Sequence, residues 1–156
     1  MYVISENCVF RKYKIRSQLA ISVLFHSIKI TECQLAKELI RFDFSRTFLS
    51  NWVCLVENES GRSTSKIKEL TNQSANFGIF QINSKMYCRR GRKGGLCNMK
   101  CEDFLNDDIG DDVRCAKTIF NQRGFSAWEG WRKKCQGRTL PDEAFLILAI
   151  GLLYAE

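Results

Sequence analysis

The chain has 156 residues, enough for one domain with a hydrophobic core and too few for two of ordinary size. Its formal net charge of +7 favours anionic partners, such as bacterial surfaces, nucleic acid and acidic lipids. The densest basic stretch, residues 89–93, has no interleaved aromatic residues, and the chain has no known nucleic-acid-reading motif. We therefore do not expect nucleic acid to be a partner.

Eight cysteines in a chain of this size indicate an oxidising compartment and a framework of disulfides. Zinc is the alternative, because Cys97 and Cys101 have a loosely suitable spacing. However, no second pair follows at ligand spacing, and the sole histidine, His26, is far away in the sequence. We therefore expect a disulfide-stapled, secreted, extracellular protein.

The two ends of the chain differ from its middle. Residues 1–29 combine basic residues with a short apolar run but lack a small-residue cleavage site, so they fit either an imperfect secretory leader or a mis-specified N-terminus. Residues 143–156 form an atypical apolar tail, which is too short for the ~20 residues of a membrane-spanning helix. A buried helix, a membrane-surface segment and a misread C-terminus all remain open for this tail. We expect one ordered domain over residues 30–142 and no membrane span.

In chain order, apolar residues at helical spacing first predict a helix over residues 33–40. A second helix is expected to follow, with Ser50 as its N-cap and Gly61 at its end. Residues 71–74 have the composition of a turn, and residues 77–83 that of a strand of mixed faces.

Two further helical segments are expected after the strands. The first runs from about Ile109 to Gly124, where glycine stops a helix well. The second, residues 126–134, is short and aromatic. Helices therefore flank a central region of strands.

Glu59 and Asn76 are the residues most relevant to chemistry. Glu59 lies in the sequence CLVENES, residues 54–60, and Asn76 opens NFGIFQINS, residues 76–84. Glutamates 57 and 59 are two apart on a helix and point to different faces, so Glu57 is expected at the surface.

Several motifs occur together in a specific order. They are Trp52-Val53-Cys54 followed by Glu59, Gly78-Ile79-Phe80-Gln81-Ile82-Asn83-Ser84, Cys97-x-x-x-Cys101, Cys115-Ala116-Lys117 and Ala127-Trp128-x-x-Trp131-x-x-x-Cys135. Each motif is weak alone, but in this order and spacing they are highly specific. Over roughly residues 30–142 the chain resembles the C-type lysozymes of the insect kind, whose non-lytic relative is α-lactalbumin.

The resemblance implies an α+β, lysozyme-like fold, in which a helical domain lies beside a small antiparallel sheet with a sugar-binding cleft between them. It also implies the disulfides Cys54–Cys135, Cys88–Cys101 and Cys97–Cys115. Cys33 should then pair with a cysteine near position 146, where this chain has Leu146. Cys8 is an alternative partner for Cys33.

By resemblance, Glu59 is the general acid, kept protonated beside the indole of Trp128. This effect is known from lysozymes, in which the charged form of a carboxyl group beside an indole is poorly solvated. Retaining glycoside hydrolysis also uses a second carboxyl group, about 5 Å away. Asn76 takes the place of the second carboxylate, and an amide cannot carry the negative charge that stabilises an oxocarbenium-like transition state. Between Gly61 and Lys85 the only other acid is Glu69. We therefore expect hydrolysis to be weak or lost.

The resemblance also predicts residues that bind sugar. Gln81 and Asn83 match strand residues that face the sugar, and Trp128 matches the cleft wall. Met86 and Tyr87 stand at the rim, where many relatives have aromatic residues. Tyr87 can stack on a sugar ring, whereas Met86 offers a softer contact and could equally be a packing residue.

Residues 103–112 resemble the calcium loop of α-lactalbumin and the calcium-binding lysozymes. Carried over, the side chains of Asn106, Asp111 and Asp112 and the carbonyls of Asp103 and Asp108 would be the ligands. Asn106 replaces an expected carboxylate, which should weaken the site. The alternative is an acidic helix N-terminus, which the helix dipole favours.

The sequence thus predicts a monomeric lysozyme-family glycosidase that acts on β-1,4-linked amino-sugar glycans of bacterial peptidoglycan. It would serve as an antibacterial hydrolase of innate immunity and would require no cofactor, although the loop at residues 103–112 could hold a structural calcium ion. The alternatives are a non-catalytic glycan-binding protein and a basic, membrane-active antibacterial protein. Killing by the last of these should fail in high salt, because salt screens exposed charges.

Overall fold

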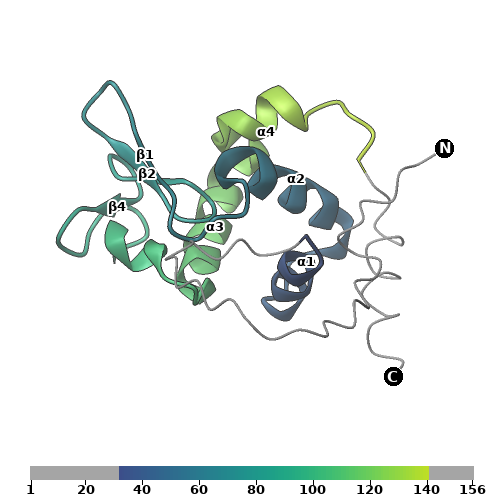
Figure 1. Ribbon diagram of the computed structural model, residues 1–156, viewed down its shortest axis with the longest axis horizontal. Coiled ribbons are helices and arrows are strands. Elements are labelled where there is room, and N and C mark those ends of the chain that lie inside the picture. The colour runs from purple at the N-terminus through teal and green to yellow at the C-terminus, as the bar shows by residue number, and fades with distance from the viewer. Residues whose placement is uncertain (1–31, 141–156) are drawn as a thin grey trace, which may run out of the picture.

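A computed structural model describes residues 32–140, with helices gathered on one side and strands on the other (Figure 1). The helices are α1 (Glu32–Arg41), α2 (Leu49–Ser60), α3 (Gly110–Arg123) and α4 (Glu129–Lys134), with short 3-10 turns η1 (Arg46–Phe48), η2 (Cys101–Leu105) and η3 (Gly124–Ala127). The strands are β1 (Ile67–Glu69), β2 (Ala75–Phe77), β3 (Ile82–Asn83), β4 (Cys88–Arg89) and β5 (Met99–Lys100).

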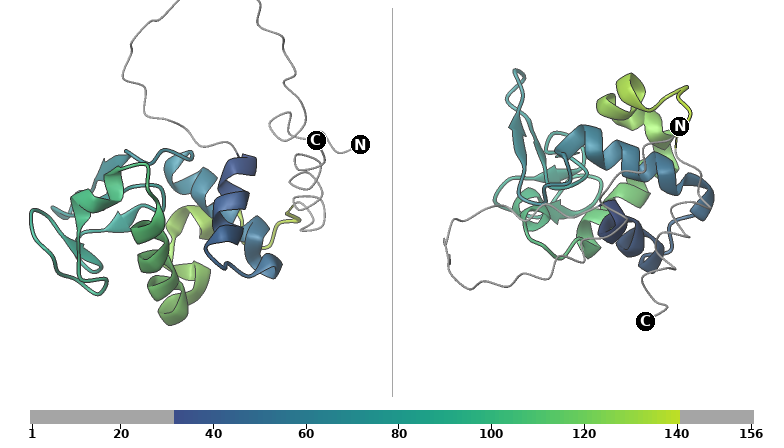
Figure 2. Two further views of the ribbon diagram at one scale, coloured as in Figure 1. Left: turned by 90° about the horizontal axis from the view of Figure 1, so that it is seen from below. Right: turned by 45° about the vertical axis from the view of Figure 1, so that its right-hand side comes forward.

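Strands β1, β2 and β3 form one antiparallel sheet, in the order β1-β2-β3. Asn76 lies in the middle strand and pairs with Lys68 on one side and Asn83 on the other. Strands β4 and β5 make a separate two-stranded parallel pair. In both views of Figure 2 the sheet lies at one end of the molecule, away from α1. The predicted α+β, lysozyme-like fold, with helices beside a small antiparallel sheet, is confirmed.

The prediction of a single strand over residues 77–83 was wrong. The chain turns at residues 78–81 between β2 and β3. Gly78 and Gln81 have positive φ angles of 72° and 51°, and the Gln81 N–H donates to the Gly78 carbonyl at 3.2 Å. A left-handed backbone at both ends of a four-residue segment reverses the chain, which the hydrophobic pattern of the segment does not reveal.

Three of the four predicted helical segments are confirmed, whereas the fourth, residues 126–134, is divided into η3 and α4 by the extended residue Trp128. Helix α1 covers the residues expected to be helical, and α3 runs to Arg123 and stops at Gly124, which has a φ of 59°. Helix α2 also ends at Gly61, in the left-handed conformation. Its start differs from the prediction, because α2 continues directly from η1 and already includes Ser50 in its first turn. Ser50 is therefore not the N-cap.

Aromatic rings join the helices into one core. Trp52 of α2 is 2% exposed, and its ring centroid lies 4.7 Å from that of Phe44, 4.8 Å from that of Phe125 and 5.6 Å from that of Trp128. Phe80, from the turn between β2 and β3, packs edge-on against Trp52 at 6.0 Å. Such pairs add about 0.5–1.5 kcal/mol each beyond the burial of their area. The turn that carries the cleft residues is thus anchored in the helical core.

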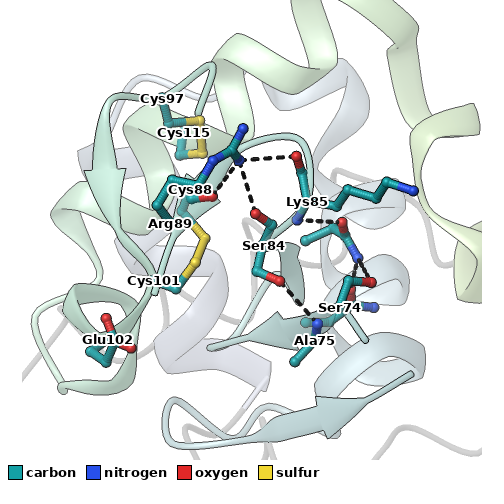
Figure 3. Close-up of a disulfide and its surroundings, with 12 residues drawn as sticks. Ser74, Ala75, Ser84, Lys85, Cys88, Arg89, Cys97, Cys101, Glu102 and Cys115 are labelled. Atoms are coloured by element: carbon teal, nitrogen blue, oxygen red, sulfur yellow. Dashed lines mark hydrogen bonds between the residues drawn. A yellow bond between two sulfur atoms is a disulfide. The ribbon is translucent and has the colours of Figure 1, made fainter. Parts of the chain in front are cut away.

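Three disulfides join the described residues, Cys54–Cys135, Cys88–Cys101 and Cys97–Cys115, as predicted. The first links α2 to the end of α4, and the other two tie the β4–β5 region to η2 and α3 (Figure 3). The expectations about Cys8, the partner of Cys33 and Leu146 lie outside the described side chains, as do those about residues 1–29 and 143–156. Between residues 32 and 140, no helix is long and apolar enough to cross a membrane.

The turn at Gly78 offers a test of the packing between sheet and helices. A Cβ atom at Gly78 would lie 2.2 Å from the Phe104 carbonyl oxygen, whereas one at Gly61 would meet nothing within 4 Å. Both glycines have positive φ, so Gly61→Ala should cost about 1 kcal/mol for the backbone alone. Gly78→Ala should cost about 3 kcal/mol, because a steric clash adds to the backbone term.

Urea unfolding of the two variants measures this difference. Equal losses of unfolding free energy in the two variants would contradict the close approach of Gly78 to η2.

Candidate functional site

A cavity of about 290 Å³ opens between the sheet and the helices. All seven residues predicted for catalysis and sugar binding line it: Glu59, Asn76, Gln81, Asn83, Met86, Tyr87 and Trp128. They come from α2, from two strands, from the turns at 78–81 and 84–87, and from the residue before α4. The structure therefore brings together residues up to 69 positions apart in the sequence. Their functional roles remain predictions.

Trp128 forms the buried wall of this cavity. Its side chain is 4% exposed, and its indole N–H donates to the Phe80 carbonyl oxygen at 2.9 Å. The indole also packs edge-on against Trp52. Because an indole nitrogen can only donate, this one bond satisfies it and fixes the ring beside the turn at 78–81.

Glu59 occupies the last turn of α2 and is half-buried. Its Oε1 accepts a hydrogen bond from the Gly130 N–H at 2.6 Å. Burial raises the pKa of Glu59 above its ordinary value of 4.5, and the Gly130 bond opposes part of that shift. A Cβ at position 130 would lie 2.8 Å from that Oε1, so a larger residue there would force the Glu59 carboxyl group to shift. Burial thus favours the protonated form of Glu59, which is the form that a general acid needs.

Asn76 is held by the neighbouring strand. Asn83 Nδ2 donates to Asn76 Oδ1 at 2.7 Å and also to the Ser74 hydroxyl oxygen at 3.2 Å. Asn83 Oδ1 in turn accepts the Lys85 N–H at 2.9 Å. The Ser74 hydroxyl continues the network to Asn72 Oδ1 at 2.6 Å. A chain of amides thus lines the floor of the cavity on the sheet side.

Gln81 has a different place from the predicted one. It lies in the turn at 78–81 and not in a strand, and its side chain is 4% exposed. Its Nε2 donates to the carbonyl oxygens of Gly78 and Lys66, at 2.8 and 3.1 Å. The amide nitrogen is therefore committed to holding the turn, while Oε1 has no hydrogen-bond partner among the described residues.

Met86 and Tyr87 differ in exposure. Met86 is 50% exposed, whereas Tyr87 is 6% exposed and its hydroxyl oxygen lies 3.4 Å from Arg123 Nη1, as a hydrogen-bond acceptor. The flat, open face needed for sugar stacking is therefore limited at Tyr87. Met86, which the sequence leaves open as a packing residue, provides the larger apolar surface at the rim.

Arg89 holds the segment that carries these two residues. Its Nη1 donates to the carbonyl oxygens of Ser84, Lys85 and Cys88 at 3.0, 2.9 and 2.8 Å (Figure 3). The Ser84 hydroxyl accepts the Ala75 N–H at 3.0 Å, which joins the same segment to β2. The turn that forms the rim is thus held in place by hydrogen bonds.

Sequence reasoning missed two cationic residues that line the cavity, Lys85 and Arg123. Lys85 directly follows the strand motif and could have been included on that ground. Arg123 ends α3 and is far from every motif used, so only the tertiary arrangement places it at the cleft.

Among the described cavity-lining residues, two carry carboxyl groups, Glu59 and Glu129. Glu129 is exposed and paired with Lys133, whose hydrogen bond lowers the pKa of Glu129. Glu69 points elsewhere, paired with Arg90 at 2.7 Å, and Glu57 is at the surface paired with Arg62 at 2.7 Å. None of these three acids has the half-buried setting of Glu59, so Asn76 faces the cavity without a second such carboxylate.

Hydrogen bonds within the loop compete with metal binding at the predicted calcium residues. Asn106 Oδ1 accepts the Asp108 N–H at 2.8 Å, and its Nδ2 donates to the Asp103 carbonyl oxygen at 2.8 Å, so two of the expected oxygen donors are engaged in the loop itself. Asp112 is 1% exposed, and neither carboxylate oxygen has a hydrogen-bond partner. Across residues 32–140, no three acidic, histidine or cysteine residues gather as a metal site.

Burial, followed by the nearby charge of Asp111, raises the pKa of Asp112 to about 9. At pH 7 and without a bound cation this carboxyl group is protonated, so calcium would have to displace the proton in order to bind. The acidic stretch therefore behaves as the start of α3, with Asp111 and Asp112 in its first turn.

A helical lobe and a small sheet, separated by a cavity with one half-buried acid, define a lysozyme-like class of protein. Comparison with known proteins agrees with this assignment. Residues 28–144 match the model of the C-type lysozyme/alpha-lactalbumin family. The chain belongs to that family, and this membership supports a glycoside hydrolase-like function.

Individual relatives are similar over most of the described domain. The chain is 46% identical to lysozyme c-1 of Anopheles gambiae over 111 residues, covering 71% of this chain and 79% of that protein. It is 47% identical to a Bombyx mori lysozyme over 113 residues, covering 72% and 82%. The crystal structure of canine milk lysozyme stabilised against non-enzymatic deamidation superposes with a TM-score of 0.66 at 37% identity, covering 71% and 92%.

The raised pKa of Glu59 predicts a pH-dependent effect of Glu59→Gln on stability. A folded-state pKa above the unfolded one costs stability as pH rises from the ordinary value through the folded value. Glutamine keeps the Oε1 acceptor for Gly130 and removes the charge. Relative to the natural protein, the variant should gain stability between about pH 4 and about pH 7.

Denaturant midpoints of both proteins, measured at about pH 4 and at about pH 7, test this expected gain in stability. Glu57→Gln is the matched control, since it loses an exposed ion pair worth no more than about 1 kcal/mol. A Glu59→Gln variant whose advantage does not grow with pH would show that Glu59 is not buried in this way.

The calcium loop makes a second prediction. Because Asp112 is buried without partners, Asp112→Asn should raise the thermal midpoint at neutral pH, and adding calcium should leave the natural midpoint unchanged. Asp111→Asn, which removes a less buried charge, is the control. A calcium-dependent rise in the midpoint that Asp112→Asn abolishes would restore the predicted calcium site.

Proposed function

We propose that the cavity binds β-1,4-linked amino-sugar glycans of bacterial cell walls, and that the chain as synthesised hydrolyses them weakly or not at all. One observation carries this proposal: Asn76 lines the cavity together with Glu59, and no second half-buried carboxylate is present among its described lining residues. The general acid is in place, and its partner is an amide.

The absence of a negative charge at position 76 affects the transition state. An oxocarbenium-like centre next to Asn76 would meet an amide oxygen that already accepts a hydrogen bond from Asn83. Such an oxygen carries only a partial charge and is a poor nucleophile. Loss of one electrostatic stabiliser typically lowers the turnover rate by about 10²–10³-fold. Glu59 and substrate strain still contribute, so a residual rate is consistent with the site.

Binding depends less on that charge. Amide groups on the sheet side supply donors and acceptors for hydroxyl and acetamido groups, and Met86 supplies an apolar rim. Lys85 and Arg123 add positive charge at the edges, which suits a glycan that carries carboxylate groups. A glycan-binding protein with low hydrolytic activity fits these features.

We further propose that the protein is secreted, acts as a monomer outside the cell and serves antibacterial defence. Three disulfides among the described residues support an oxidising compartment. The net charge of +7 supports attraction to anionic bacterial surfaces. The family match over residues 28–144 supports a functional domain close to the expected 30–142.

Clearing of a suspension of Gram-positive cell walls tests the proposal. Freshly purified protein, with Asn76 verified by mass spectrometry, is compared with Asn76→Asp. The variant should clear the walls about 10²–10³-fold faster, because a carboxylate at position 76 stabilises the transition state that the amide cannot.

Two controls complete this test. Glu59→Gln combined with Asn76→Asp should lose clearing while still sedimenting with insoluble walls. Equal clearing by the natural protein and Asn76→Asp would show that another group replaces the second carboxylate. Absence of binding to walls and to soluble amino-sugar oligomers by the folded protein would overturn the proposed substrate.

A further inference from the structure

We propose that the cavity hydrolyses the side-chain amide of Asn76, so that the chain converts its own Asn76 to aspartate and thereby gains the second carboxylate. The chemistry at Asn76 stands on the cavity geometry alone. The resulting gain in glycan hydrolysis rests on the function proposed above. In this proposal, the protein with asparagine at position 76 is the precursor of a form with two carboxyl groups in the cavity.

The hydrogen bonds determine which atom of Asn76 faces Asn83. A backbone N–H, that of Lys85, occupies Asn83 Oδ1 at 2.9 Å, so the other end of the Asn83 amide must be the donor Nδ2. That donor contacts Asn76 at 2.7 Å, so Asn76 must present its carbonyl oxygen there. The carbonyl of the Asn76 amide is therefore polarised by a donor that its own support holds in place.

This polarisation is what amide hydrolysis needs. When water adds to Asn76 Cγ, negative charge develops on Oδ1. Asn83 Nδ2 already points at that oxygen, so the charge is stabilised without reorganisation of the site. The second acceptor of Asn83 Nδ2, the Ser74 hydroxyl oxygen at 3.2 Å, further fixes the direction of the amide.

Glu59 supplies the proton transfers. In its ionised form it takes a proton from the attacking water as the water oxygen bonds to Cγ. When the Cγ–Nδ2 bond breaks, the Glu59 carboxyl group returns that proton to the nitrogen, which leaves as ammonia. One water is consumed, one ammonia is released, and no electrons are exchanged. Glu59 and Asn76 line the same cavity of about 290 Å³, which is large enough to hold the attacking water.

The usual route of asparagine deamidation is disfavoured at this position. In that route, the backbone nitrogen of the following residue attacks Cγ and forms a cyclic imide. The following residue, Phe77, is 3% exposed and lies in β2, which is paired with β1 and β3 on both sides. The imide route also opens to a mixture of aspartate and isoaspartate, whereas direct hydrolysis by water yields aspartate alone. The product therefore reports the route.

The product also fits the site. A carboxylate at position 76 would accept the same Asn83 Nδ2–H as a charge-assisted bond, which is stronger than the bond to an amide. It would share a cavity with Glu59, whose raised pKa favours the protonated form that a general acid needs. Conversion thus leaves the hydrogen-bond network unchanged and adds one negative charge.

Timed peptide mapping tests the inference. The full-length natural protein is incubated in neutral buffer, and the peptide that contains residues 75–83 is analysed for asparagine, aspartate and isoaspartate at position 76. We expect aspartate without isoaspartate to accumulate, and wall clearing to rise in parallel toward the rate of Asn76→Asp. Glu59→Gln should slow the conversion about 100-fold by removing the proton-transfer group. Asn83→Ala should slow it about 100-fold by removing the donor to Oδ1.

Controls separate this route from general ageing. Glu57→Gln, on the exposed face of α2, should leave the conversion rate unchanged. Asn98, in an exposed turn at a φ of 50°, reports ordinary deamidation in the same samples. Urea unfolding of each variant verifies that it is folded, and urea-unfolded natural protein gives the product mixture of the imide route.

Each outcome supports or overturns the inference. Asn76 that stays an amide while Asn98 deamidates would overturn it. So would isoaspartate at position 76, or an unchanged rate in folded Glu59→Gln. Aspartate that accumulates as expected but brings no wall clearing would uphold the conversion and overturn the proposed hydrolase. An unconverted protein that still binds walls would leave the proposed binding function intact and end this inference alone.

Discussion

The hydrogen bond from the Trp128 indole to the Phe80 carbonyl oxygen is the interaction on which the cleft depends. It crosses from the helical lobe to the turn between β2 and β3, and both groups are buried. Leaving either group unpaired in that interior would cost about 1–3 kcal/mol. Because Trp128 also packs on Trp52, the same side chain joins the sheet to the aromatic core and forms the cavity wall. The position of the turn, and of everything on it, follows from that contact.

Two kinds of polar group line the two sides of the cavity. On the helix side stands one carboxyl group, whose pKa burial raises and whose oxygen the Gly130 N–H holds. On the sheet side stands a network of side-chain amides, anchored by the Lys85 N–H and extended by the Ser74 hydroxyl. Geometry on both sides is well supported, and only the charge on the sheet side differs from that of a carboxylate pair. In the proposed function, the distinction between binding and cutting is therefore electrostatic.

The charge at position 76 can differ without any difference in the shape of the cavity. An amide and a carboxylate have nearly the same shape, so Asn76 occupies its place without disturbing β2 or its hydrogen bond to Asn83. Transition-state stabilisation, however, depends on full negative charge. A cavity can thus keep its form and its ligand contacts while its chemistry depends on a single side-chain atom.

The sequence by itself determined the family, the helices with clear periodicity or glycine stops, the three disulfides and seven of the residues that line the cavity. Those features are carried by local pattern or by motifs whose spacing is specific, as in Glu59, the segment 78–84 and Trp128. It did not reveal the break at residues 78–81, because positive φ at Gln81 is a property of the folded turn and not of the residue type. It also did not reveal that η1 leads straight into α2, which removes Ser50 from the cap.

Only the tertiary structure decided which cavity residues are exposed and which already use their hydrogen-bonding groups within the protein. Tyr87 is buried and Met86 exposed, although they are neighbours in the sequence, because the supported turn at 84–88 points them differently. Gln81 Nε2 is used by backbone carbonyls, and Asn106 closes its own loop instead of offering its oxygen to a metal. Arg123 lines the cleft from the end of α3, far in the sequence from every motif that predicted the site. Residue types are local properties, whereas burial, hydrogen-bond partners and the environment of a charge arise from segments that meet only in the folded chain.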